Sequence, residues 1–134
     1  MNRMSHDTLI TKANRAIQSA RILFGDGDMD GACNRAYYAM FDAAKAALLK
    51  ATSDVDSTIG KTHAGLIAAF GIKLVKTGVV PIEFGRLFNR AHDIRQAADY
   101  TGDIIEDEQI KEIITQASEF VEWIDHNLIS GAKN

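Results

Sequence analysis

Four side chains able to handle a phosphate group lie within nine residues of the chain: His92, Arg95, Asp99 and Tyr100. An arginine guanidinium can bind a phosphate through two parallel hydrogen bonds, and a nearby histidine or tyrosine can donate or accept a proton. Arg95 and Asp99 are four positions apart, so their side chains meet on one face of a helix. The spacing indicates a polar site of one of two kinds: a phosphate-binding cleft or a structural ion pair.

The element that must position these side chains is a helix predicted from Pro81 to about Tyr100 and ended by Gly102. Arg95 projects into the middle of its apolar stripe, and His92 and Asp99 lie at the margin. A buried charge without a partner is very costly, so Arg95 must be paired or solvated. At helical periodicity the stripe contains Phe84, Leu87, Phe88, Ala91, Ile94 and Ala98.

A second helix, expected over 34–51, has an apolar face wide enough to need neighbours on several sides. Tyr38 and Leu49 fall outside that face, so Tyr37 is predicted to face the core and Tyr38 a surface or partner. Arg35 and Tyr38 then become candidates for lining the same groove as Arg95. The apolar arc contains Cys33, Ala36, Tyr37, Met40, Phe41, Ala44, Ala47 and Leu48.

Three further helices complete the prediction, over about 5–24, 60–76 and 106–128. Ser5 is the expected cap of the first, 25–31 a connector in which Asp28 or Asp30 caps the central helix, and 52–58 a loop. His63 faces inward near the start of its helix, either as a binding residue or as a hydrogen-bonded core residue. No strand is predicted. Short loops between long helices favour an all-α, up-and-down antiparallel bundle of four main helices with a fifth alongside, in one domain over 1–134.

Composition narrows the possible functions. The net charge of -3 argues against a strongly basic nucleic-acid binder but leaves room for a local basic groove. No apolar run is long enough for a membrane span and the N-terminus lacks a secretory signal, so we expect a cytoplasmic protein. The single cysteine, Cys33, is expected to be buried. No histidine pair has the spacing of a zinc site, and the aspartate-rich 25–31 segment lacks the glutamate of a calcium loop. We therefore expect neither metal nor cofactor.

Three segments, in this order and spacing, resemble the HEPN domain family: NRAYYAMFDAAKAALL, KTHAGLIAAF and IRQAADY. The resemblance covers most of the chain, and Asn34 to Leu49 is its most specific part. It implies a helical bundle that forms a homodimer, and a partner that is a minimal nucleotidyltransferase, as in toxin–antitoxin systems. It also implies possible activity as a metal-independent endoribonuclease.

The ribonuclease members of the family have an arginine followed, after four to six residues, by a histidine. Arg95 occupies the arginine place here, but the run continues to Asp99 and Tyr100 without that histidine. Arg86 and His92 have the right separation, yet they point about 120° apart on a helix. Tyr100 could replace the histidine, or could be a tyrosine modified by the partner nucleotidyltransferase, as in some family pairs.

Three hypotheses follow from the sequence. The first is a HEPN module that binds nucleotide, RNA or a nucleotidyltransferase through a cleft containing Arg95, Asp99 and Tyr100. The second is an active ribonuclease toxin that uses Arg95 with Tyr100 or His92. The third is a dimerisation bundle whose polar cluster is purely structural.

Overall fold

The computed structural model describes residues 5–51, 62–102 and 104–131. In these ranges the chain is helical and contains no strand, which confirms the predicted all-α class. Five α-helices and two short π-helical turns form in this order: α1 His6–Gly25, α2 Met29–Ala51, α3 His63–Phe70, η1 Gly71–Val75, α4 Ile82–Thr101, α5 Asp107–Ile124 and η2 Asp125–Ile129.

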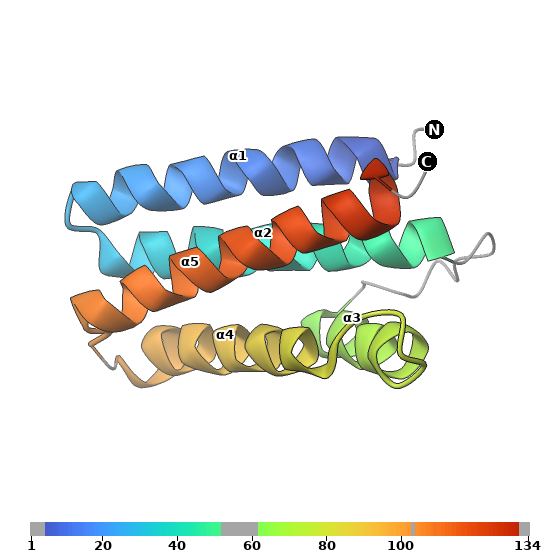
Figure 1. Ribbon diagram of the computed structural model, residues 1–134. Helices are drawn as coiled ribbons and strands as arrows, with labels where there is room; N and C mark the ends of the chain where they lie inside the picture. Colours follow the sequence, from blue (N-terminus) through green and yellow to red (C-terminus); the bar gives the residue numbers. More distant parts are fainter. Residues whose placement is uncertain (1–4, 52–61, 103, 132–134) are drawn as a thin grey trace.

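The four long helices run alternately in opposite directions, as expected for an up-and-down bundle (Figure 1). Helix α2 is the central one: α1, α3, α4 and α5 all pack against it. The short helix α3 continues into η1 and lies at one end of α4. The start of α1 and the end of η2 lie at the same end of the bundle (Figure 1). None of the helices in the described part of the chain is long and apolar enough to cross a membrane.

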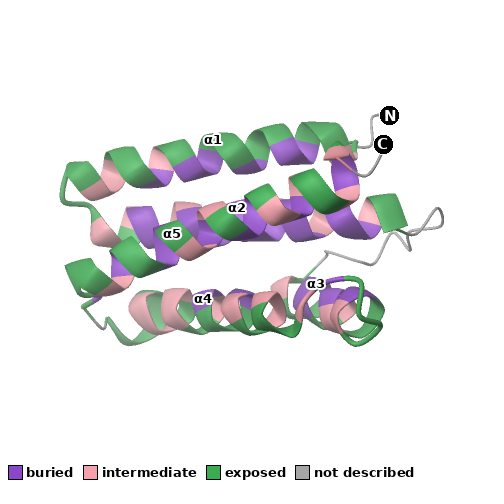
Figure 2. Cartoon of the chain, in the orientation of Figure 1, coloured by how far each residue is buried: buried purple, intermediate pink, exposed green. Residues whose placement is uncertain are grey.

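Small side chains allow α2 to take this central place. Seven of its alanines are buried, together with the whole apolar arc predicted for this segment. Neighbouring backbones can approach alanine closely, so α2 is covered on most sides (Figure 2). One strip remains partly exposed, and its members recur at helical spacing: Gly31, Asn34, Arg35, Tyr38, Asp42, Lys45 and Leu49.

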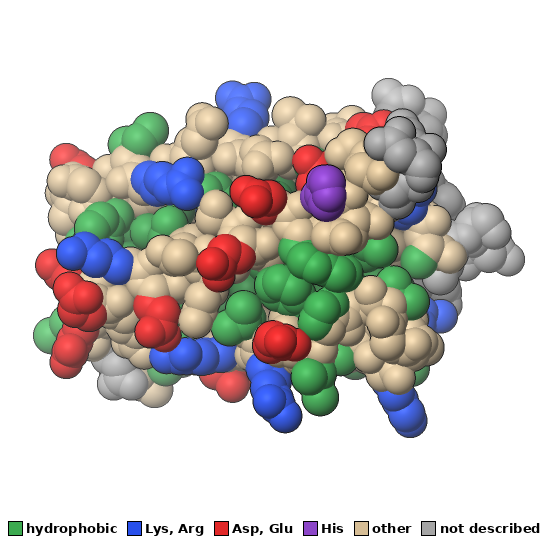
Figure 3. All heavy atoms as spheres, in the orientation of Figure 1, with side chains coloured by type: hydrophobic (Ala, Val, Ile, Leu, Met, Phe, Trp, Pro, Cys, Tyr) green, Lys and Arg blue, Asp and Glu red, His purple; other side chains and the backbone are tan. Residues whose placement is uncertain are grey.

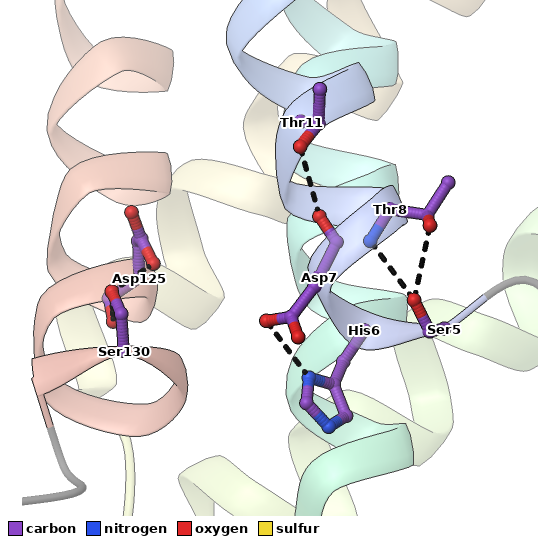
Figure 4. A network of polar contacts seen from close by, with 7 residues as sticks. All are labelled: Ser5, His6, Asp7, Thr8, Thr11, Asp125 and Ser130. Carbon is purple, nitrogen blue, oxygen red and sulfur yellow. Dashed lines mark hydrogen bonds and ion pairs between the residues drawn. The ribbon is translucent and has the colours of Figure 1, made fainter.

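The helix boundaries follow from local capping. Ser5 accepts a hydrogen bond from the backbone N–H of Thr8 and its hydroxyl contacts that of Thr8, as predicted for the α1 cap (Figure 4). The connector is shorter than predicted. Helix α2 begins at Met29, because the Asp28 carboxylate accepts from the N–H of Gly31 at 2.8 Å. The expected 52–58 loop and the expected helix start near residue 60 lie outside the described residues.

Helix α4 packs more loosely than its sequence pattern predicts. Of its six-residue apolar stripe, only Phe88 and Ala91 are buried, because α4 lies at the edge of the bundle. Gly85 faces Val75 so closely that an added Cβ would lie 3.2 Å from a Val75 methyl group. The helix ends where Gly102 adopts a φ of 71°, a conformation that favours glycine.

Candidate functional site

The side chain of Arg95 lies where α2, α3 and α4 meet, and only 19% of it is exposed. Its Nη2 is 3.5 Å from Oδ2 of Asp99, one turn further along α4. Its Nη1 is 3.5 Å from Nδ1 of His63, the first residue of α3. The predicted Arg95–Asp99 pair therefore forms, and a histidine from another helix joins it.

This geometry defines the protonation of His63. A guanidinium only donates hydrogen bonds, so the facing Nδ1 must accept and the imidazole proton belongs on Nε2. Nε2 lies 3.3 Å from the hydroxyl of Tyr38. The hydroxyl oxygen then accepts from Nε2–H, which leaves the Tyr38 proton free to be donated to another group.

Aromatic rings enclose these polar groups. The Arg95 guanidinium carbon lies 5.3 Å from the ring centre of Tyr37 and 5.4 Å from that of Tyr38, within the range of cation–π attraction. The His63 ring lies 5.0 Å from Phe41 and 5.5 Å from Tyr37, centre to centre. His92 approaches from α4, with its ring 5.5 Å from Tyr37. The site is thus a cation and two imidazoles against an aromatic wall.

Both imidazoles are held in the neutral form. Burial lowers the pKa of His63, and the positive charge of Arg95 lowers it further, with a smaller contribution from His92. Burial also lowers the pKa of His92, and there Asp93 opposes the shift while Arg95 adds to it. Neutral histidines can accept a proton at neutral pH.

Three polar atoms of this site are buried and have no hydrogen-bond partner among the described residues: the Tyr37 hydroxyl, Nδ1 of His92 and Nε of Arg95. Most buried polar atoms in folded proteins are paired, so three unpaired atoms in one cluster are unusual.

The profile of the family described as "HEPN domain" matches residues 6–127. The chain belongs to the HEPN family. A Methanocaldococcus jannaschii protein named "Putative toxin MJ0605" is 38% identical over 116 residues, which is 87% of this chain and 83% of that protein. A second protein of that organism, "Putative toxin MJ0142", is 30% identical and covers 92% of this chain and 82% of its own length. A Thermotoga maritima "UPF0332 protein" is 33% identical over 85% and 83% of the two chains.

The structure thus brings Arg95 and Asp99 of this HEPN domain together with His92. It also places His63 and Tyr38, the binding candidates from two other helices, in the same cluster. The histidine that the family motif places shortly after the arginine is absent, and His63 occupies the space beside Arg95 instead.

Tyr100 is not part of this cluster. Its side chain is 83% exposed, and no hydrogen bond or ring contact joins it to another described residue. Arg86 is exposed as well, whereas His92 is half-buried, in keeping with their different directions on α4. Arg35 is linked to the cluster through Tyr38, whose ring centre lies 5.6 Å from its guanidinium carbon.

Sequence reasoning placed Tyr37 only in the core, and missed its role as a wall of the site. The helical periodicity of α2 predicts correctly that Tyr37 is buried, but only the packing of α3 and α4 shows which residues it faces.

Cys33 is buried as predicted, and burial raises its pKa to about 11, so it remains a thiol at neutral pH. In the part of the chain that the structure describes, no three His, Cys, Asp or Glu side chains are grouped as metal ligands.

Proposed function

We propose that this protein is a toxin-like HEPN module that binds the phosphate backbone of RNA at Arg95. The observation that carries the proposal is the contact of the Arg95 guanidinium with His63 in a half-buried, aromatic-walled cluster. A guanidinium in such surroundings is weakly hydrated and binds phosphate oxygens strongly. Family membership and two relatives named as toxins support a role of this kind.

The same contact favours a second candidate, metal-independent cleavage of RNA. In that reaction the 2′-hydroxyl oxygen attacks the adjacent phosphorus and gives up its proton, while the bond to the 5′ oxygen breaks and that oxygen takes a proton. The products are a 2′,3′-cyclic phosphate and a 5′-hydroxyl. A bound phosphate would take over the hydrogen bond from Nη1 of Arg95, which frees Nδ1 of neutral His63 to accept a proton, and the Tyr38 hydroxyl, with its proton free, suits the role of donor.

We further propose a homodimer and a nucleotidyltransferase partner. A second copy could cover the apolar side chains of Tyr100 and Ile104, which are 83% and 92% exposed near the end of α4. A partner nucleotidyltransferase is what the resemblance to the family leads us to expect. Co-purification with the product of a neighbouring nucleotidyltransferase gene would test it.

Fluorescence anisotropy with a labelled single-stranded RNA tests the main proposal, with EDTA present throughout. We expect Arg95→Gln to weaken binding by about tenfold or more, because it removes a charge-assisted phosphate contact. Arg86→Gln is the matched control: it removes the same charge from the exposed side of the same helix. Equal effects of the two variants, or no RNA binding by the unmodified protein, would contradict the proposal. Gel analysis of the same RNA distinguishes cleavage from binding alone.

A further inference from the structure

A second group of cations lies between α1 and the partly exposed strip of α2. Between α1 and α2 the surface forms a hollow of about 240 Å³. Its polar lining comes from both helices: Lys12, Arg15 and Ser19 of α1, and Arg35 and Asp42 of α2. Lys12, Arg15 and Ser19 are spaced three and four residues apart, so α1 presents them on one face.

The cations of the hollow are not neutralised by ion pairs within the described part of the fold. Among the described residues, none of Lys12, Arg15 and Arg35 forms an ion pair, and Nε of Arg35 is buried without a hydrogen-bond partner. Asp42 is the only acidic residue in the lining. Three cations against one carboxylate leave the hollow positive.

The rest of the molecule makes this local charge stand out. Helix α5 carries five carboxylates and one lysine, and on the face on which it lies acidic side chains are interspersed with Lys and Arg (Figure 3). The overall charge of -3 therefore conceals an uneven distribution. A polyanion would avoid the α5 face and be attracted to the cations of the hollow.

One aromatic ring connects the hollow to the Arg95 site. Tyr38 has the Arg35 guanidinium carbon 5.6 Å and the Arg95 guanidinium carbon 5.4 Å from its ring centre. Cations that alternate with an exposed aromatic edge are the arrangement with which proteins bind single-stranded nucleic acid. Tyr38 is half-buried and belongs to the partly exposed strip of α2.

We propose that Lys12, Arg15, Ser19 and Arg35 form a second phosphate subsite, which binds a neighbouring phosphate of the same single-stranded RNA that Arg95 holds. This inference rests on the proposed function of the Arg95 site. The RNA strand would then run from Arg95 on α4, across the Tyr38 ring, to the face of α1 that carries Lys12 and Arg15. A membrane surface is disfavoured because none of the large exposed apolar side chains lines the hollow.

The test compares two double variants that remove the same charge. The first variant combines Lys12→Gln with Arg15→Gln and so removes two of the three positive side chains that line the hollow. The control combines Lys73→Gln, in η1, with Lys76→Gln, directly after η1, and removes two exposed lysines elsewhere. All four positions are exposed, and thermal unfolding by circular dichroism verifies that both variants fold. The probes are a fluorescein-labelled eight-nucleotide RNA and a labelled dinucleotide, which is long enough for the Arg95 site alone.

We expect the Lys12/Arg15 variant to bind the eight-nucleotide RNA about tenfold more weakly and to reduce the slope of log K against log salt by about 1.4. Its affinity for the dinucleotide should stay within about twofold of the unmodified protein, and the Lys73/Lys76 control should bind both probes nearly normally. Arg95→Gln should weaken both probes.

The alternative outcomes separate the two proposals. Equal loss in the two double variants, or none in either, overturns the second subsite while leaving the Arg95 site intact. Loss with the Lys12/Arg15 variant but not with Arg95→Gln supports the subsite and overturns the proposed function. An unmodified protein that binds neither RNA overturns both.

Discussion

Nη1 of Arg95 lies 3.5 Å from Nδ1 of His63, although the two residues are 32 positions apart in the chain. The contact joins the last third of α4 to the first residue of α3. It provides this HEPN domain with an arginine–histidine pair without the histidine that the family motif places after the arginine.

Replacing His63 by glutamine should separate cleavage from binding. Glutamine keeps a polar side chain beside Arg95 but cannot act as a proton acceptor near neutral pH. If the protein cleaves RNA, we expect the single-turnover rate to fall by about 10²-fold or more, with RNA affinity within about threefold of the unmodified protein. His126→Gln, at an exposed position of η2, is the control. A full cleavage rate in the His63 variant would remove His63 from the reaction.

Arg95→Lys tests whether the geometry of the guanidinium matters, or only its charge. Lysine retains the positive charge but cannot form two parallel hydrogen bonds to a phosphate. We expect RNA affinity to fall by about tenfold in an anisotropy titration. A purely structural cluster predicts the opposite pattern: a lower melting temperature with unchanged RNA binding.

Acid should weaken the fold through the two histidines of the site. Their pKa values in the folded protein lie below the usual 6.5, so the unfolded chain binds more protons once the pH falls below about 6.5. Their contribution to stability is complete above that pH and is lost as the pH falls. Urea unfolding at about pH 7.5 and about pH 5 should show the decrease, and the His63→Gln/His92→Gln double variant should show a smaller one.

A second ionisable group acts in the opposite direction and must be separated from this effect. Burial raises the pKa of Asp42, an effect that Lys12, Arg35 and Lys45 partly oppose, so the folded state binds its proton more readily than the unfolded chain does. Asp42 therefore favours the fold as the pH falls. Comparing the double histidine variant with the unmodified protein at each pH removes this contribution, because Asp42 is common to both. Identical pH dependence in the two proteins would contradict the histidine prediction.

Much of the scaffold can be predicted from sequence, because it depends on local rules. Helical periodicity identified the buried arc of α2, and capping chemistry identified Ser5 and narrowed the cap of α2 to Asp28 or Asp30, of which the structure has Asp28. The contact between His63 and Arg95 could not be predicted in the same way. It depends on how α3 is placed against α4, and no local pattern defines that packing. The exposure of α4 could not be predicted for the same reason, because its apolar stripe does not indicate that the helix lies at the edge of the bundle.

Lys12 and Arg15 show a further limit of the sequence. Their spacing on one helix face was visible, but charged pairs of this kind are common on solvated helices. Only the pairing of α1 with α2 brings them to Arg35 and creates the hollow. The net charge of the chain did not reveal this local group of cations, because the carboxylates of α5 offset cations elsewhere in the molecule.

Tyr37→Phe is expected to leave the protein as stable as before or to stabilise it by about 1 kcal/mol. The hydroxyl is buried without a partner among the described residues, so removing it abolishes a desolvation cost while the ring contacts remain. Chemical denaturation measures the change. A loss of more than about 1 kcal/mol would indicate that the hydroxyl is bonded in solution.

The proposed homodimer can be tested at Ile104, which is 92% exposed. We expect Ile104→Asp to shift the molar mass in light scattering from dimer to monomer at micromolar concentration, because a charge cannot be buried in an apolar contact. Ile22→Asp is the matched control, since Ile22 is 72% exposed on α1. A monomeric unmodified protein would refute the dimer.

The buried alanines of α2 set the distance between the two proposed phosphate-binding sites. Helix α2 lies between α1 and α4, so its thickness sets the separation of Lys12 and Arg15 from Arg95 (Figure 1). An alanine there cannot be enlarged without moving a neighbouring helix outward. The two sets of cations would then move apart, and the spacing between the bound phosphates would change with them. If RNA follows the proposed path, the small side chains of α2 fix the distance between its two bound phosphates, so larger residues at these positions should change the RNA length that binds best.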